Sequence, residues 1–238
     1  MLDRRGDNFI IWRKMKNFYR KFQVVSKFPL WPHYLRQVYK DAIRDATKLK
    51  AQDAILDNPN FTCLLCGVSG EITAREYVNF VLKIKPQSKM IIIDLEHDQV
   101  NSVKQLVEKE FPSANVKVRQ ANALNLSFIS DKSIDWIDTD GFFSFFNEQN
   151  LLALFREWKR ILKKDGFITF RELTSHGLIS SIANKLRDLA SQLYMGVKLN
   201  LHSTDELYKD FEKVKYRFSR GTSPLPLLDR YCLVNTYE

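Results

Sequence analysis

The sequence has few cysteines and no long apolar run. Three cysteines in 238 residues cannot provide the disulfide framework of a small secreted protein. Two of them, Cys63 and Cys66, are spaced as Cys-x-x-Cys, but they lie in an apolar strand without a second pair or a histidine cluster, which favours buried thiols over a metal site. No stretch approaches the roughly 18 apolar residues of a membrane-spanning helix, and the N-terminus lacks a signal-peptide core. We therefore expect a folded, cytoplasmic protein without a bound metal.

The positive charge is concentrated in the first fifth of the chain. The net charge is +9, and residues 1–50 carry 13 Lys and Arg against four Asp, so this segment accounts for all of the excess. A basic field attracts the phosphates of RNA or of a membrane surface, and a solvated basic helical arm is the alternative. Its apolar residues Trp12, Met15, Tyr19 and Phe22 trace one helical face. That face can dock on the body or on a second subunit, lie on a membrane, or cover the substrate pocket.

Short apolar strands alternate with amphipathic helices after residue 60. The expected strands are 61–66, 90–93, 116–120, 133–138 and 167–170, and the expected helices are 71–85, 98–111, 148–162 and 178–194. Two further strands, 214–218 and 231–234, are expected to close the sheet in antiparallel fashion. This alternation predicts an α/β fold: a doubly wound, mostly parallel seven-stranded sheet with helices on both faces. A turn at 57–60 separates a helical arm or lid, residues 1–57, from this domain, residues 58–238.

The stretch from Phe61 to Asp94 predicts a nucleoside-binding unit. It reads as a strand, a glycine-bearing turn, a helix and a second strand that ends in a carboxylate. Glycines let backbone N–H groups approach a ligand, and a carboxylate at the tip of the next strand can accept hydrogen bonds from both ribose hydroxyls. Asp94 follows Gly70 by 24 positions, near the roughly 20 typical of such units.

The segment Glu157–Phe167 reads EWKRILKKDGF, in which the lysines and Gly166 predict a helix stop before the fifth strand. This segment is similar to the helix, turn and fifth strand of the class I S-adenosylmethionine-dependent methyltransferases, and residues 61–173 as a whole resemble that family. Three shorter matches support the similarity. They are Gly70-Glu71-Ile72-Thr73 at the first turn, Ile93-Asp94 at the end of the second strand, and Ala121-Asn122-Ala123 after the third strand, where the family usually has Asp-Ala. The family turn is usually Asp/Glu-x-Gly-x-Gly-x-Gly, and this chain departs from it with Leu64, Cys66 and Val68. Two of these side chains stand where glycines let the cofactor approach.

The resemblance implies S-adenosylmethionine as the cofactor and roles for individual positions. The turn from Gly67 to Gly70 would hold the methionine part, Asp94 the ribose, Leu95 the adenine face and Asn122 the adenine amino group. The backbone after the fourth strand would line the place of methyl delivery. The implied cofactor-binding residues are Cys66, Gly67, Ser69, Gly70, Asp94, Leu95, Asn122, Ala123 and Thr139.

Methyl transfer from a sulfonium needs mainly alignment, with a base only where the acceptor must lose a proton. Asp140, His176 and His202 are the candidate bases, although a surface or capping role is the plainer interpretation of the histidines. The motifs of nucleic-acid methylating members are missing, which favours a small-molecule or lipid-like acceptor. The alternatives are an RNA methyltransferase that uses the basic arm and a non-catalytic binding or scaffold protein. A peripheral membrane location accompanies the lipid hypothesis, and the sequence leaves the oligomeric state open.

Overall fold

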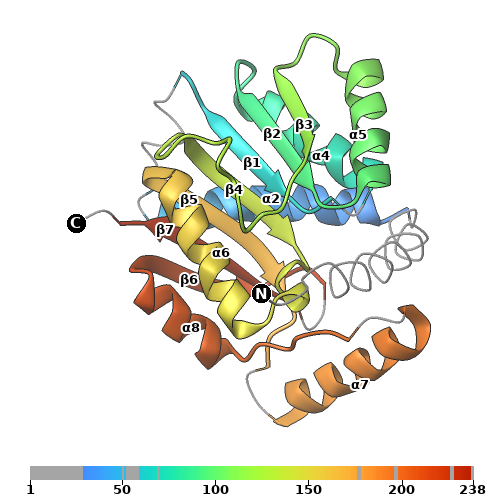
Figure 1. Cartoon of the computed structure of the whole chain (residues 1–238), viewed down its shortest axis with the longest axis vertical. Coiled ribbons are helices and arrows are strands. Elements are labelled where there is room, and N and C mark those ends of the chain that lie inside the picture. The colour runs from blue at the N-terminus through green and yellow to red at the C-terminus, as the bar shows by residue number, and fades with distance from the viewer. Residues whose placement is uncertain are drawn as a thin grey trace, which may run out of the picture.

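A seven-stranded sheet forms the centre of the protein in the computed structural model, which describes residues 29–49, 51, 59–68, 70–175, 178–195, 198–225 and 228–236 (Figure 1). The strands are β1 (Thr62–Cys66), β2 (Lys89–Asp94), β3 (Val116–Gln120), β4 (Ile134–Asp140), β5 (Leu162–Glu172), β6 (Tyr216–Thr222) and β7 (Asp229–Asn235). Their order is β3-β2-β1-β4-β5-β7-β6. The first five strands are parallel, and β7 runs antiparallel to both β5 and β6. The expected doubly wound sheet is confirmed.

Helices cover both faces of the sheet, as Figure 1 shows. The described helices are α2 (Trp31–Lys48), α4 (Glu71–Ile84), α5 (His97–Glu110), α6 (Glu148–Ile161), α7 (Leu178–Met195) and α8 (Thr204–Lys213). Along β1, Cys63 and Leu65 point into the core under α2, α4 and α5, while Leu64 and Cys66 point into the core under α6 and α8. Because successive strand residues face opposite sides, a strand that is buried on both faces must be apolar throughout. This requirement explains the continuous apolar run of β1.

The junction between α6 and β5 differs from the expected glycine stop. Helix α6 ends at Ile161 and β5 begins at the next residue, Leu162. The positive φ falls on Asp165, at 59°, and not on Gly166. A Cβ atom at Gly166 would come within 3.0 Å of the carbonyl oxygens of Ile134 and Lys163. The glycine is therefore needed for close backbone approach between β4 and β5 and not for a left-handed turn.

Helix α2 packs on the body of the fold. Its Leu35, Val38 and Tyr39 are buried in the core beneath α4, and Asp45 accepts a 2.6 Å ion-paired hydrogen bond from Arg230 of β7. The remainder of the expected arm, including the face traced from Trp12, lies outside the described residues. The division of the chain at residue 57 stays a prediction.

Helix α7 has the expected bounds to within a residue, but its polarity is unexpected. Leu186 and Leu193 are exposed to solvent by 62% and 80%, whereas Asn184 is buried. Among the described helices, none is long and apolar enough to cross a membrane.

Candidate cofactor and acceptor site

A cavity of about 160 Å³ opens at the carboxyl ends of β1 and β2, where ligands bind in open α/β sheets. One side is formed by Gly67 after β1, by Asp94 and Leu95 at the end of β2, and by residues 121–124 after β3. The other side is an aromatic wall contributed by the loop after β4. A dry cavity of about 150 Å³ accommodates a benzene ring, so this one has room for a small flat ring.

The turn after β1 is shaped by Gly67 and fixed by Asp94. Gly67 has φ 75° and donates its N–H to the Ile93 carbonyl oxygen at 2.9 Å. The Asp94 carboxylate is 4% exposed and accepts the N–H of Val68 at 2.7 Å and that of Glu96 at 2.8 Å. These two bonds join the turn to the start of α5 and hold the carboxylate rigidly at the cavity wall.

The predicted cofactor residues divide into three groups. Five of them line the cavity together: Gly67, Asp94, Leu95, Asn122 and Ala123. Leu95 is 40% exposed there, and Asn122 accepts the Leu124 N–H at 3.0 Å through its side-chain oxygen.

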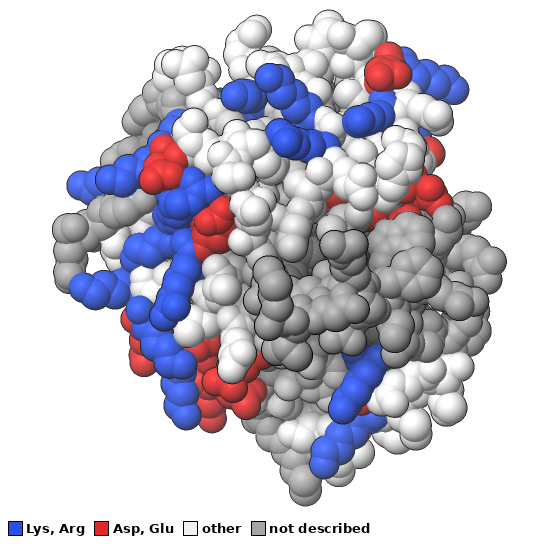
Figure 2. Space-filling view, viewed as in Figure 1, with Lys and Arg blue, Asp and Glu red and all other residues white. Residues whose placement is uncertain are grey.

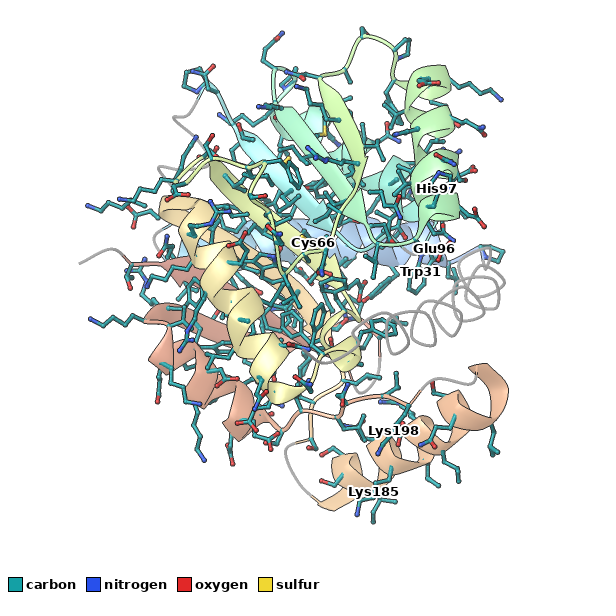
Figure 3. The ribbon with its side chains drawn as sticks, viewed as in Figure 1. Trp31, Cys66, Glu96, His97, Lys185 and Lys198 are labelled. Atoms are coloured by element: carbon teal, nitrogen blue, oxygen red, sulfur yellow. The ribbon has the colours of Figure 1, made fainter. Side chains whose placement is uncertain are left out.

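The second group supports the turn from behind and is not part of the cavity lining. Cys66 is fully buried at the end of β1 (Figure 3), and Thr139 donates its hydroxyl to the Cys66 carbonyl oxygen at 2.7 Å. Gly70 caps α4 and accepts the Ala74 N–H at 3.3 Å. The third group is Ser69 alone, which lies outside the described residues.

The aromatic wall consists of Phe142, Phe145 and Phe146, which flank and form the one-turn helix η1 (Phe143–Phe145). Glu172, at the end of β5, accepts the Phe143 N–H at 2.7 Å and the Ser144 hydroxyl at 2.8 Å. Burial raises the pKa of Glu172 to about 7, against the lowering effect of these donors. The wall is thus held by a buried carboxyl group.

His202 is a second support of the same turn. Its Nε2 lies 3.1 Å from the Phe143 carbonyl oxygen and 3.0 Å from that of Phe146, so Nε2 carries the proton and donates to both. The ring is buried. His176, the other candidate histidine, lies outside the described residues.

A buried charge cluster lies at the ends of β4 and β5. Arg171 donates to both oxygens of Asp138, at 2.7 and 3.0 Å, and forms an ion pair with Asp140 at 3.6 Å. The Tyr34 hydroxyl of α2 donates to Asp140 at 3.2 Å. Burial raises the pKa of Asp140, in part offset by Arg171. Asp140 thus combines a raised pKa with a neighbouring aromatic hydroxyl, but it is not among the residues that line the cavity.

No group of three or more His, Cys, Asp or Glu side chains suited to hold a metal ion occurs in the described ranges.

Four residues of this region were not predicted to act in it. Tyr34 comes from the segment assigned to the arm, and Arg171 and Glu172 lie at the end of β5. Asn150 lines the cavity from the first turn of α6. The only available signal was the unusual Arg-Glu pair that ends an apolar strand, since charges there need partners when buried.

The cavity suits the adenosyl part of S-adenosylmethionine. A Cβ atom at Gly67 would lie 2.8 Å from the Phe142 ring, so a side chain at this position would push into the wall. On the side of the cavity opposite the aromatic wall lie the exposed apolar side chain of Leu95 and the carboxylate of Asp94, which is held by backbone donors. These are the contacts that a ring and a sugar require.

Comparison with known proteins gives one domain family and many similar folds. Residues 71–166 match the family model described as "Methyltransferase domain". A search of curated proteins by sequence found no match.

Solved structures with the same fold include the YcgJ protein of Bacillus subtilis, with a TM-score of 0.62 and 14% identity over 81% of this chain and 99% of that one. An S-adenosylmethionine-dependent methyltransferase of Methanosarcina mazei has a TM-score of 0.58 and 13% identity over 76% and 95% of the two chains. One of Thermotoga maritima, described as a possible histamine N-methyltransferase, has a TM-score of 0.60 and 16% identity over 96% and 100%.

Proposed function

We propose that this chain, which carries the methyltransferase domain of the class I S-adenosylmethionine-dependent methyltransferases, transfers a methyl group to a small-molecule or lipid-like acceptor. The observation that carries the proposal is the cavity where Gly67, Asp94, Leu95 and Asn122 meet the aromatic wall. S-adenosylmethionine supplies a methyl group on a positively charged sulfur, from which a nucleophile can take it.

The cofactor-binding role falls to the residues on the β1 and β2 side of the cavity. Asp94 would accept the ribose hydroxyls while its backbone partners hold it in place. Leu95 and Ala123 would cover the faces of the adenine ring. Asn122 would accept the adenine amino group through its amide oxygen, without the charge assistance that an aspartate gives.

Asp140 is the group that we assign to the acceptor's proton. Strands β1 and β4 are parallel neighbours, with Leu65 paired to Asp138. Asp140, the last residue of β4, therefore lies at the same edge of the sheet as the turn at Gly67. Its raised pKa makes its carboxylate a stronger base than an exposed one. Arg171 and Tyr34 hold the carboxylate in position. The proton that Asp140 takes up would come from the hydroxyl or amine of the acceptor.

A small or lipid-like acceptor fits an entrance walled by phenylalanine. Phe142 and Phe146 stack edge to face, with their centroids 5.0 Å apart, and both line the cavity. Apolar walls with few polar groups are typical of small-molecule sites. Among the proteins of similar fold, the Thermotoga protein is described as a possible histamine N-methyltransferase, and another is described as the pyocyanin biosynthetic protein PhzM. These descriptions support a small acceptor.

The test separates binding from transfer with three proteins. Wild type, Asp94→Asn and Asp140→Asn are titrated calorimetrically with S-adenosylmethionine. Asp94→Asn should weaken binding by roughly 1–3 kcal/mol, because the asparagine side chain has one acceptor oxygen where the carboxylate has two. Asp140→Asn should bind the cofactor as wild type does, because it still accepts from Tyr34, yet lose about tenfold or more in turnover with an acceptor that must lose a proton. Asp98→Asn, an exposed carboxylate on α5, is the matched control.

Turnover is measured as labelled methyl from S-adenosylmethionine recovered in three fractions of a cell extract: organic-soluble, water-soluble small molecules and RNA. Label in either of the first two supports the proposal. Label confined to RNA would establish the alternative acceptor class. No heat of binding at millimolar cofactor would refute the enzymatic function altogether.

A further inference from the structure

Helix α7 presents four large apolar side chains to solvent. Four residues at helical spacing form what we name the α7 stripe, with exposed fractions of 51% for Ile182, 62% for Leu186, 53% for Leu189 and 80% for Leu193. The opposite face carries polar residues, of which Asn184 and Ser191 are buried. A surface helix of a globular protein normally has the reverse arrangement. Contiguous exposed apolar side chains of this kind mark an interaction surface.

Lysines border the stripe. Lys185 is exposed and lies three positions after Ile182 and four before Leu189, so it is their neighbour on the helix surface. Lys198, also exposed, follows just beyond the helix, and both lie at the same end of the molecule (Figure 3). Figure 2 shows blue side chains beside white surface at that lower end. The stripe therefore combines apolar contact with positive charge.

We infer that α7 lies on an anionic lipid surface. The stripe would enter the boundary between headgroups and acyl chains, and the two lysines would stay beside the phosphates. An amphipathic helix of this composition binds membranes through the sum of buried apolar area and electrostatic attraction. The net charge of +9 attracts the whole molecule to the same surface.

A second copy of the chain is the less suitable partner. A stable interface takes roughly 20–30 residues on each side, whereas the stripe has four. Two copies that each carry +9 also repel one another. A lipid surface needs neither a large area nor a complementary shape, only apolar depth of about 5–10 Å and negative charge.

Helix α7 is connected to the aromatic wall by two hydrogen bonds of the segment that follows it. Asp188 of α7 accepts the Leu199 N–H at 2.7 Å, and Asn200 donates its N–H to the Ser144 carbonyl oxygen at 2.8 Å. Ser144 lies in the η1 turn that carries the aromatic wall. The helix that carries the stripe is thus held to the segment that leads to the aromatic wall. The inference goes beyond the proposed function, because lipid binding needs neither cofactor nor methyl transfer.

The experiment measures partition of the full chain onto vesicles by sedimentation, without S-adenosylmethionine. The vesicles are phosphatidylcholine with a quarter phosphatidylserine, and phosphatidylcholine alone. The double variant Leu186→Gln/Leu193→Gln should bind anionic vesicles about tenfold or more weakly than wild type. Leu30→Gln, which removes a 65% exposed leucine outside α7, is the matched control and should bind as wild type does. Circular dichroism checks that each variant is folded.

The charge contribution is tested on the same vesicles. Lys185→Gln and Lys198→Gln should each reduce partition about fivefold at low salt. Lys104→Gln removes an exposed lysine from α5 and should have a clearly smaller effect. Wild type should bind pure phosphatidylcholine more weakly than the anionic mixture.

Residues 1–50 carry strong positive charge and can add to vesicle binding, so the comparison between variants of the full chain isolates α7. Unchanged partition of the Leu186→Gln/Leu193→Gln protein would overturn the inference. So would light scattering that shows a wild-type dimer which this double variant dissociates, since the stripe would then be covered by a second copy. Equal binding of wild type to neutral and anionic vesicles would overturn the assigned role of the lysines.

Discussion

At the scale of single residues, the site depends on one glycine more than on the glycine-rich turn that is usual in class I methyltransferases. Gly67 has a positive φ of 75°, and a Cβ atom there would meet the Phe142 ring at 2.8 Å. Cys66 and Val68, which occupy family glycine positions, are buried, and their side chains are absent from the cavity lining. Among the described residues of the turn, the position with the left-handed backbone is therefore still a glycine.

Gly67→Ala should lower the free energy of unfolding by about 1–2 kcal/mol through the left-handed backbone and by roughly 1 kcal/mol more through crowding of Phe142. It should also weaken S-adenosylmethionine binding, because the displaced ring narrows the cavity. Gly141→Ala is the control. Gly141 has a φ of 60°, but a Cβ atom added there would have no other atom within 4 Å, so this variant carries the backbone cost alone. Thermal unfolding and calorimetric titration measure both effects, and equal losses in the two variants would contradict the crowding argument.

At the scale of elements, the turn η1 depends on the protonation of Glu172. Burial raises the pKa of this carboxyl group from 4.5 to about 7, so the folded protein binds more protons than the unfolded chain between these values. The Glu172 contribution to stability is complete below about pH 4.5 and is lost as the pH rises through 7. The difference amounts to about 3 kcal/mol.

Glu172→Gln should remove this part of the pH dependence, which is measured as the free energy of unfolding of variant minus wild type from about pH 3 to 8. Glu206→Gln is a control of opposite sign. The pKa of Glu206 is lowered by its bonds to Ser203 in the α8 capping box, so its stabilisation is lost as the pH falls below its usual range. A flat difference for Glu172→Gln would show that the carboxyl group has the same pKa in the folded and unfolded protein, and that Glu172 does not make the turn pH-dependent.

Elements are also where sequence reasoning was most successful. The bounds of α4 and β3 were predicted to within one residue, because hydrophobic periodicity is a local property. The orientation of α7 could not be predicted in this way. An amphipathic pattern shows that a helix has an apolar face, but which side faces solvent depends on contacts made elsewhere in the chain.

At the scale of the whole molecule, pairs of distant residues join α2 to the sheet and to the site. Tyr34 and Asp140 are 106 positions apart, and Asp45 and Arg230 are 185 apart. No spacing rule predicts such pairs, and the prediction of an arm treated α2 as an appendage for this reason. Asp94 was predicted at the end of its strand because the apolar run that it closes is a local pattern, and parallel pairing brings it to the same edge of the sheet as the turn after β1.

The attachment of α2 can be measured by comparing two of its ion pairs. Arg230 pairs with Asp45 at 2.6 Å and Asp41 at 3.4 Å, and both carboxylates are largely buried. Arg36 pairs with Glu76 of α4 at 3.0 Å, but its side chain is 53% exposed. Arg230→Met should lower the free energy of unfolding by roughly 2 kcal/mol, less than the 3–5 kcal/mol of a fully buried broken pair, because Arg44 still contacts Asp41 at 2.8 Å. Arg36→Met, the exposed counterpart on the same helix, should cost no more than about 0.5 kcal/mol. Urea denaturation of the three proteins decides the matter: equal small losses would mean that α2 is held by its apolar face alone.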